Sequence, residues 1–562
     1  MSGTDWFVAV FTILFIVLYG IWKSRGIKNI DGFILADREM KWYHVGLSVM
    51  ATQASAITFL SAPGQGYADG LQFVQLYFGL PIAMIIICIA FVPAFHNLNV
   101  YTAYEYLEKR FDHKTRTLTA FLFLFQRGIS TGITIYAPAL ILSLILGIDI
   151  NVMIVFTGVL IILYTVYGGT KAVSHTQVPQ MIIIFAGLFL TAWLIIQLLP
   201  DNVSFGNALH IAGKMDHINA VNPQFDRNDK YNLWSGVIGG LFLHLSYFGT
   251  DQSQVGRYLT GSSVAQSRLG LIMNGLLKVP MQFLILLIGV LVFTFYQFHE
   301  PPAMFNTTEA ESIRKGKYAE EFRSLEMEHK IIYAEKEIHV KAYAKALEKK
   351  DAAQIQLLEN ILRIDHEKYT KNHQAITALA KKHDPNVGDD SNFVFISFIT
   401  KYLPVGVIGL LIAIIFLAAM GATASGINAL TSTTIIDFYK RSVRKNETEK
   451  HYLSASRWIT VGWGVFCIIT AVFAGRIGNL IEAVNVLGSY FYGTILGIFL
   501  VAFYLKKVGG NAVFAAACIA EVFIVYAGYN ELVAFLWLNI IGCFMVMLLA
   551  YIFEQPFSFE QK

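Results

Sequence analysis

The sequence predicts an all-α polytopic membrane protein, and two observations support this fold class. First, 55% of the 562 residues are apolar and only 15% are charged, whereas about a quarter of the residues of an ordinary soluble domain are charged. Second, the apolar residues form long runs, and a run of about 20 residues is enough for a helix that crosses a bilayer. This composition excludes a nucleic-acid-binding protein, a disulfide-rich scaffold and a disordered protein.

Thirteen apolar segments predict thirteen membrane spans. The first segment has no basic stretch before it and no small-residue cleavage site after it, so we expect a retained helix and not a signal peptide. The expected spans are residues 4–22, 43–66, 72–96, 117–147, 151–168, 175–199, 233–250, 265–298, 392–428, 452–474, 478–505, 511–528 and 532–553.

The charged residues are concentrated between the eighth and ninth expected spans. Residues 301–390 contain 15 Lys or Arg and 16 Asp or Glu, which is 31 of the 82 charged residues in the chain. We therefore divide the chain into the first part of a transporter-like core (1–300), a charged insertion (301–391) and the second part of the core (392–562).

Lys and Arg in the short loops predict the orientation. With the N-terminus placed outside, the inner loops hold 21 Lys or Arg and the outer loops hold 4, the insertion being left out of the count. Positive charge is enriched in short cytoplasmic loops. We expect a multi-pass protein of the plasma (inner) membrane, with the N-terminus and the insertion outside and the C-terminus in the cytoplasm.

Two expected spans change from apolar to small and polar residues partway along. In the second span the change covers Ala51–Thr58, and in the seventh it lies within His244–Gln254. Small residues also let helices pack closely, but two such segments five spans apart favour helices that are broken near the membrane midplane, where free backbone groups bind ions or polar solutes. The spacing predicts two inverted five-helix repeats, spans two to six and seven to eleven.

The insertion has the composition of amphipathic helix. Residues 309–382 contain one Gly and no Pro, and many of their charges form i, i+4 pairs. A turn at Lys349–Lys350 followed by Asp351 as a helix cap predicts a helical hairpin, and one continuous helix is the alternative. The insertion is a protein-docking arm, an extracellular lid or a solvated spacer.

Five motifs give the chain a family resemblance. They are YTAYEYLEKRF (101–111), IYAPALIL (135–142), VYGGTKAV (166–173), DQSQVGRYL (251–259) and LKVPMQF (277–283). With them the chain resembles the sodium:solute symporter family, and most closely the branch with the sodium/iodide, monocarboxylate and multivitamin symporters. The resemblance covers almost the whole chain except residues 300–390. It implies the LeuT-type fold, a 5+5 inverted repeat, and sodium-driven uptake of a small solute by alternating access.

The same resemblance implies a main sodium site with five oxygen ligands. Three are backbone carbonyls and two are hydroxyls of a Ser/Thr pair that lies seven and six residues before Asn428. In this chain that pair is replaced by Gly and Ala, which have no side-chain oxygen. The positions of the site are Ala51, Ala54, Ala418, Gly421 and Ala422.

A second departure lies on the implied ion path. Gln177 stands where the family usually carries an Asp, so a carboxylate becomes a neutral amide. Two alternatives are open: sodium coupling at this site is altered or absent, or sodium is still held by carbonyls, Ser55 and water. The neighbouring His175 would titrate near neutral pH, but a histidine in the inner headgroup region is the simpler interpretation.

By resemblance, the solute lies between the broken spans. Tyr247 matches an inner aromatic gate, and Thr58 replaces a Gln that contacts sugars in related transporters. Arg127 and Lys278 lie inside apolar runs, where a cation is costly unless it faces a cavity or a partner; with His244 they favour a small organic anion. The candidate solute-binding positions are Gln53, Thr58, Tyr77, Tyr136, His244 and Lys278.

These observations predict a secondary active transporter and no enzyme, because no metal-ligand cluster, phosphate-binding loop or nucleophile motif is apparent in the sequence. A carrier that is sodium-independent or proton-linked is the first alternative. A transporter-like receptor or scaffold that acts through the external arm is the second. We expect no cofactor apart from sodium as a coupling ion. The expected partners are a small solute, membrane lipids and, for the insertion, a protein; nucleic acid is not among them.

Overall fold

The computed structural model describes residues 1–23, 29–385, 387–475 and 478–559, and within these ranges the regular elements are helices. One isolated bridge joins Met40 and Gly261. The helices of the body are α1 (Gly3–Lys23), α3 (Trp42–Gln53), α4 (Ala56–Asp69), α5 (Leu80–Ile86), α8 (His113–Leu146), α9 (Ile150–Gln197), α11 (Gly240–Gly249), α12 (Gln252–Tyr258), α13 (Val264–Phe298), α17 (Ser391–Tyr402), α18 (Val407–Thr433), α19 (Glu449–Ala474), α20 (Leu480–Tyr504), α21 (Gly510–Tyr529) and α22 (Phe535–Phe559). Short helices in the connections are α2 (Ile30–Leu35), α6 (Val92–Asn97), α7 (Tyr104–Arg110) and α10 (Phe205–Lys214).

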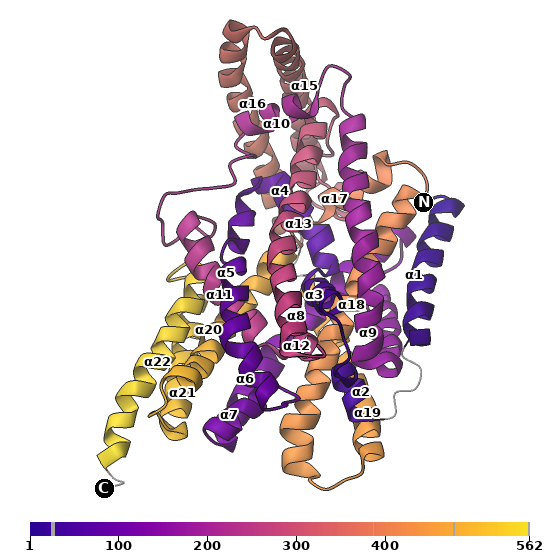
Figure 1. Ribbon diagram of the computed structural model, residues 1–562. Helices are drawn as coiled ribbons and strands as arrows, with labels where there is room; N and C mark the ends of the chain where they lie inside the picture. Colours follow the sequence, from indigo (N-terminus) through magenta and orange to yellow (C-terminus); the bar gives the residue numbers. More distant parts are fainter. Residues whose placement is uncertain (24–28, 386, 476–477, 560–562) are drawn as a thin grey trace.

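The helical body is that of an integral multi-pass membrane protein (Figure 1). Ten described helical segments are long and apolar enough to cross a membrane, and α3 with α4, which meet at a bend of 61°, make an eleventh. The segment Ser235–Gly249 is apolar but shorter. The expected spans 151–168 and 175–199 are joined in α9, which is kinked at Gly169, where φ is +52° and only glycine fits easily.

The expected ninth span, 392–428, was wrong in its bounds. Residues from Ser391 to Tyr402 form the separate helix α17, and the span runs from Val407 to Val443, through α18 and the π-helical stretch η5 (Thr434–Val443). Pro404 lacks an amide hydrogen, and Gly406 has a φ of +90°, so the chain turns between the two helices. A hydropathy profile does not reveal this turn, because the residues before and after it are apolar.

The first broken helix packs deep within the body. The helix α3 contacts α13 and α9, and α4 contacts α13 and α17. At the crossing of α3 and α13, a Cβ on Gly46 would lie 2.8 Å from the carbonyl oxygen of Gly270. Because no side chain fits there, the two backbones approach closely and α3 is fixed against α13.

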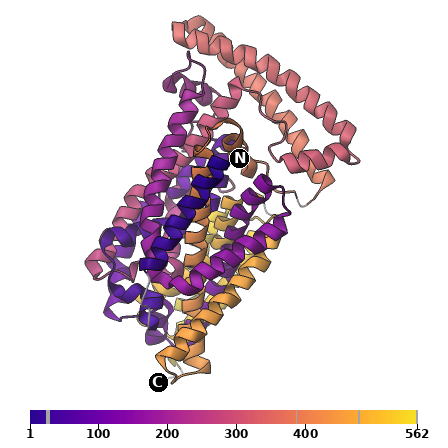
Figure 2. The same cartoon turned by 90° about the vertical axis from the view of Figure 1, so that its right-hand side faces the viewer.

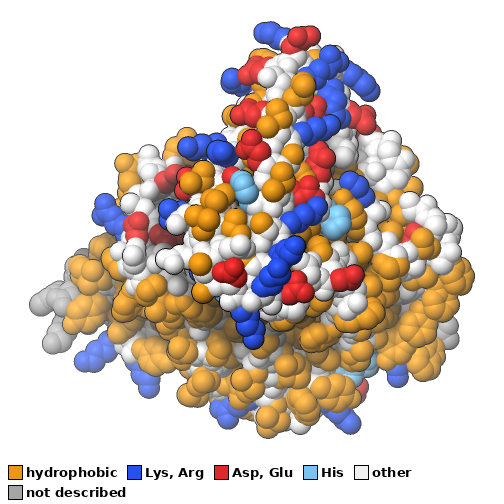
Figure 3. Space-filling view, turned by 90° about the horizontal axis from the view of Figure 1, so that it is seen from above, with side chains coloured by type: hydrophobic (Ala, Val, Ile, Leu, Met, Phe, Trp, Pro, Cys, Tyr) orange, Lys and Arg blue, Asp and Glu red, His pale blue; other side chains and the backbone are white. Residues whose placement is uncertain are grey.

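Residues 301–390 contribute three helices outside the body, α14 (Thr307–Lys315), α15 (Ala319–Lys349) and α16 (Ala352–His383). The last two pack antiparallel and project from one end of the bundle (Figures 1 and 2). Lys350 turns the chain with a φ of +55°, and the Asp351 carboxylate accepts a hydrogen bond from the Gln354 amide at 3.2 Å. Seen from above, this arm carries mixed charge while the body around it is largely apolar (Figure 3).

The first and the last described helices point to opposite ends of the bundle. The N-terminus lies at the end that carries the arm, and α22 runs toward the other end (Figure 1). The division of the chain at residues 301 and 391 stays a prediction, which rests on the distribution of charged residues along the sequence.

Candidate functional site

Both small, polar segments found in the sequence are breaks between helices. In the first, Ala54 (φ −82°, ψ 76°) and the extended Ser55 (ψ 175°) separate α3 from α4. In the second, Thr250 and Asp251 separate α11 from α12. Each break interrupts the helical hydrogen-bond ladder, so backbone groups become free to bind other partners.

A small cavity of about 80 Å³ lies between α4, α8, α11 and α20. Five of the seven predicted solute and gate positions line it, namely Gln53, Thr58, Tyr77, His244 and Tyr247. The polar lining residues Thr134, Asn485 and Tyr492 were not predicted from the sequence. Ser55 had been predicted for the ion path, and Arg127 as a buried cation that favours an anion. The full lining is Gln53, Ser55, Ile57, Thr58, Tyr77, Arg127, Thr134, Leu243, His244, Tyr247, Ile481, Val484, Asn485 and Tyr492.

Two predicted positions lie outside the cavity lining. The hydroxyl of Tyr136 lies beside Gly475, where it would be 3.0 Å from a Cβ on that glycine. Lys278 is fully buried, and its Nζ lies 5.8 Å from the ring centroid of Tyr77. Because the ring of Tyr77 also packs on His244 at 5.6 Å, Lys278 lies behind the cavity wall and not on it.

Several buried polar atoms of this region have no hydrogen-bond partner among the described residues. They include both ring nitrogens of His244, Nζ of Lys278 and Oε1 of Gln53. A buried polar group without a partner costs about 1–3 kcal/mol, and native proteins satisfy most such groups. Unpartnered donors and acceptors around one cavity therefore indicate a site for a polar ligand or for water.

Arg127 is neutralised within the structure. Its Nε donates to Oδ2 of Asp251 at 3.0 Å, its Nη2 also bonds this oxygen, and its Nη2 donates to the hydroxyl of Tyr492 at 3.0 Å. The guanidinium also lies 5.2 Å from the ring centroid of Tyr247. Arg127 is thus a paired charge that links α8 to the second break, and it adds no net charge to the cavity, in contrast to our interpretation from the sequence.

The positions of the expected sodium site lie buried where α3, α9 and α18 meet. The structure buries four of them, Ala51, Ala54, Ala418 and Ala422. Gln177 of α9 is fully buried beside them. The structure therefore brings these positions and the expected ion-path residue into one region.

The uncharged side chain of Gln177 makes four hydrogen bonds in this region. Its Nε2 donates to Ser425 Oγ at 3.1 Å, Thr52 Oγ1 at 3.4 Å and the Gly421 carbonyl at 3.5 Å. Its Oε1 accepts from Ser48 Oγ at 2.5 Å. A neutral amide thus bonds the oxygen atoms that lie next to the expected ligand positions.

The two hydroxyls nearest in sequence to the missing pair are also engaged. Ser425 Oγ donates to the Gly421 carbonyl at 2.7 Å, and Thr423 Oγ1 pairs with Thr134 Oγ1 at 2.8 Å. Neither replaces the missing hydroxyls in this conformation. Among the described residues, no group of three or more His, Cys, Asp or Glu side chains is arranged to hold a metal ion.

Comparison with known proteins identifies one protein family that the sequence matches. The sequence model of the sodium:solute symporter family matches residues 33–310 and 377–520. The chain is 31% identical over 303 residues to a sodium/iodide cotransporter of Homo sapiens, which covers 53% of this chain and 46% of the relative. It is 34% identical over 280 residues to sodium-coupled monocarboxylate transporter 1 of Xenopus laevis (49% and 44%), and 25% identical over 490 residues to a sodium-dependent multivitamin transporter of Oryctolagus cuniculus (86% and 63%). The matched part thus spans about half the length of the first two relatives.

A solved structure extends the likeness to the fold. The substrate-bound, outward-open state of a Na⁺-coupled sialic acid symporter superposes with a TM-score of 0.76, and the match covers 99% of this chain and 98% of that one at 20% sequence identity. The predicted fold class is therefore confirmed as all-helical and LeuT-like.

Proposed function

Because the chain belongs to the sodium:solute symporter family, we propose that it is a secondary active transporter that moves a small solute by alternating access. The observation that carries this proposal is the cavity at the first helix break, which residues of α11 before the second break also line, with unpartnered polar atoms around it. Broken helices of this kind hold solutes and ions in transporters with inverted repeats.

The solute that best suits this site is a small organic anion. With Arg127 paired to Asp251, the one buried cation next to the cavity without a described partner is Lys278, behind Tyr77. A carboxylate would satisfy the donors of His244 and offset the charge of Lys278. The cavity of about 80 Å³ favours a short molecule.

We further propose that sodium coupling at the main site is weakened or absent. Gly421 and Ala422 supply no hydroxyl, and the neutral Gln177 amide donates to the Gly421 carbonyl and to Ser425, next to the positions of the missing hydroxyls. Sodium prefers such hard oxygen ligands. Transport would then run without sodium or with a proton.

For the orientation, we propose an outside N-terminus, a cytoplasmic C-terminus and an outside arm. The distribution of Lys and Arg between the short loops supports this. A membrane-impermeant maleimide added to intact cells should label Lys349→Cys on the arm and not Lys506→Cys, which lies between α20 and α21. Labelling of Lys506→Cys alone would reverse the orientation.

The function is tested in proteoliposomes. Labelled acetate and lactate are offered with a sodium gradient, a proton gradient or neither, and labelled glucose serves as the neutral control. We expect carboxylate uptake that does not depend on sodium. Uptake of glucose unaffected by acetate would overturn the anion proposal, strict sodium dependence would overturn the coupling proposal, and no uptake under any gradient would favour a receptor or scaffold role.

A further inference from the structure

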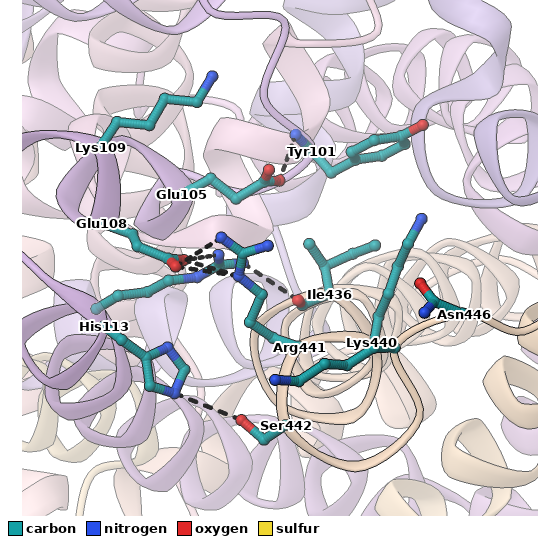
Figure 4. Close-up of a pocket in the computed structure, with 12 residues that line it drawn as sticks. Tyr101, Glu105, Glu108, Lys109, His113, Ile436, Lys440, Arg441, Ser442 and Asn446 are labelled. Carbon is teal, nitrogen blue, oxygen red and sulfur yellow. Dashed lines mark hydrogen bonds and ion pairs between the residues drawn. The ribbon is translucent and has the colours of Figure 1, made fainter.

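A cavity of about 1020 Å³ opens at the end of the bundle opposite the arm. The helix α7, the start of α8 and the end of η5 with the residues after it form its walls (Figure 4). Most of its lining side chains are charged. Nothing in the transport proposal uses this cavity.

The floor of the cavity is a fixed ionic network. The buried Arg116 side chain lies 2.6 Å from Oδ1 of Asp437 and also pairs with Glu108. Thr102 Oγ1 donates to the same Asp437 oxygen at 2.9 Å, and Arg441 bonds Glu108 at 2.6 Å. Figure 4 shows the carboxylate of Glu108 bonded to the guanidinium of Arg441. The network joins α7, α8 and η5, so the walls are held in place without a ligand.

Both carboxylates of the lining are already engaged. Glu108 is bound by two arginines, as described above. Glu105 Oε1 accepts hydrogen bonds from the amides of Tyr101, at 2.8 Å, and Thr102, at 3.2 Å. Neither carboxylate therefore has its full charge free to neutralise a lysine in the cavity.

Three lysines of the lining have no ion-pair partner among the described residues. Lys109 donates a hydrogen bond to the Leu98 carbonyl at 3.3 Å, and Nζ of Lys440 lies 5.1 Å from the ring centroid of Tyr452. The third is Lys445. Together with the two arginines, the lining holds five cations against two carboxylates, and Asp437 beneath it adds a third carboxylate. An excess of two positive charges in one concave site attracts anions.

We propose that this cavity binds a phosphate-bearing anion, with Lys109, Lys440 and Lys445 as its charged donors. A phosphate group carries several acceptor oxygens, and it can satisfy several ammonium groups at once. Two sources offer this chemistry. One is the headgroup of an anionic lipid, because the exposed Val443 directly follows the lining residue Ser442 and gives an acyl chain an apolar path. The other is a soluble phosphate ester.

The test uses the full-length protein in a neutral detergent. Its melting temperature is measured after addition of phosphatidylglycerol, phosphatidylcholine, glycerol 3-phosphate or inorganic phosphate. A ligand that binds only the folded state raises the melting temperature, and we expect phosphatidylglycerol to raise it by at least about 2 °C. Phosphatidylcholine should have no effect, and 0.5 M NaCl should reduce the rise because it screens charge.

Two matched variants locate the binding. The change K440Q/K445Q should abolish the rise. The change K506Q/K507Q removes the same charge from two exposed lysines near α7 and should leave the rise intact. A rise with glycerol 3-phosphate or inorganic phosphate as well identifies a soluble source, and a rise with phosphatidylglycerol alone identifies a lipid. No rise in the parent protein, or an equal rise in K440Q/K445Q, overturns the proposal.

Discussion

Gln177 of α9 and Ser425 of α18 are joined by a hydrogen bond of 3.1 Å from Nε2 to Oγ, across the region where the family resemblance places the main sodium site. The same amide reaches Thr52 and the Gly421 carbonyl. The NH2 group of an amide is neutral and donates hydrogen bonds, whereas a sodium ion needs oxygen lone pairs. The hydrogen bond thus offers a physical reason for the proposed loss of sodium coupling, and substitutions that remove the amide and restore the ligands should reverse this loss.

The first prediction is a gain of sodium dependence in Q177D/G421S/A422S. The triple change restores two hydroxyls and a carboxylate. The Cβ added at Gly421 meets the flexible end of Gln180 at 2.9 Å, and it lies 3.7 Å from Nε2 of Gln177, which is itself replaced. We expect uptake in proteoliposomes to rise at least about tenfold with an inward sodium gradient, which corresponds to ~1.4 kcal/mol of coupling. The variant A419S adds a hydroxyl two residues from Gly421, on another face of α18, and should stay sodium-independent. If the triple variant and A419S respond alike, the missing ligands are not the cause.

The second prediction concerns the Arg127–Asp251 pair. Removing one partner of a buried ion pair leaves an uncompensated charge and typically costs about 3–5 kcal/mol. We therefore expect D251N and R127Q each to lower the free energy of unfolding by that amount, measured by denaturation in mixed micelles. The double variant R127Q/D251N should recover part of the loss, since no lone charge remains. Additive losses in the double variant would show that the two residues do not act as a pair.

The third prediction tests the charge behind the cavity. K278M keeps an apolar chain of similar length but removes the buried ammonium, so the Kd for a transported carboxylate should rise at least about tenfold, or ~1.4 kcal/mol. The measurement is equilibrium binding of labelled lactate to the purified protein. K401M makes the same change at an exposed position at the end of α17 and should leave the Kd unchanged. An unaltered Kd in K278M would remove Lys278 from solute recognition.

Local features of the sequence were enough to predict the two helix breaks. Ala54–Ser55 and Thr250–Asp251 interrupt apolar segments with small or polar residues, and both are breaks in the structure. The partner of Arg127 was not predicted, because Asp251 lies 124 residues away in the chain. No periodicity within one helix records a contact between two helices, so the pairing depends on how α8 and the second break are packed.

The arm shows the same limit of sequence patterns. Its charged, amphipathic composition suggested a solvated surface, yet Lys336 of α15 is only 2% exposed. Its Nζ lies 4.6 Å from the ring centroid of Tyr369 in α16 and 5.7 Å from that of Phe293 in α13. The ion pair of Lys214 with Glu359, at 2.9 Å, adds a contact between α10 and the arm. The charge pattern of one helix does not show which of its lysines another helix will cover.

These contacts lead to the fourth prediction, that docking of the arm strengthens as pH rises. Burial lowers the pKa of Lys336 to about 7, although Asp365 opposes this effect. In an undocked arm its pKa would be about 10.4. Between these values the undocked arm holds one more proton, so each pH unit favours docking by up to about 1.4 kcal/mol; below about pH 7 Lys336 is protonated in both states and its contribution is constant.

The histidines at the same contact act in the same direction at lower pH. Burial lowers the pKa of His217 to about 4 and that of His366 to about 3, while their undocked values would be near 6.5. As pH falls below 6.5 the protein with an undocked arm gains protons that the docked form does not, so docking weakens further. Hydrogen exchange of α15 and α16, corrected for the intrinsic rate, should therefore be slower at pH 9 than at pH 7, and slower at pH 7 than at pH 5. K336M should lose the change between pH 7 and 9 and keep the change below it, whereas K345M, at an exposed position of α15, should keep both; equal exchange at pH 7 and 9 in the parent protein would rule out control by Lys336.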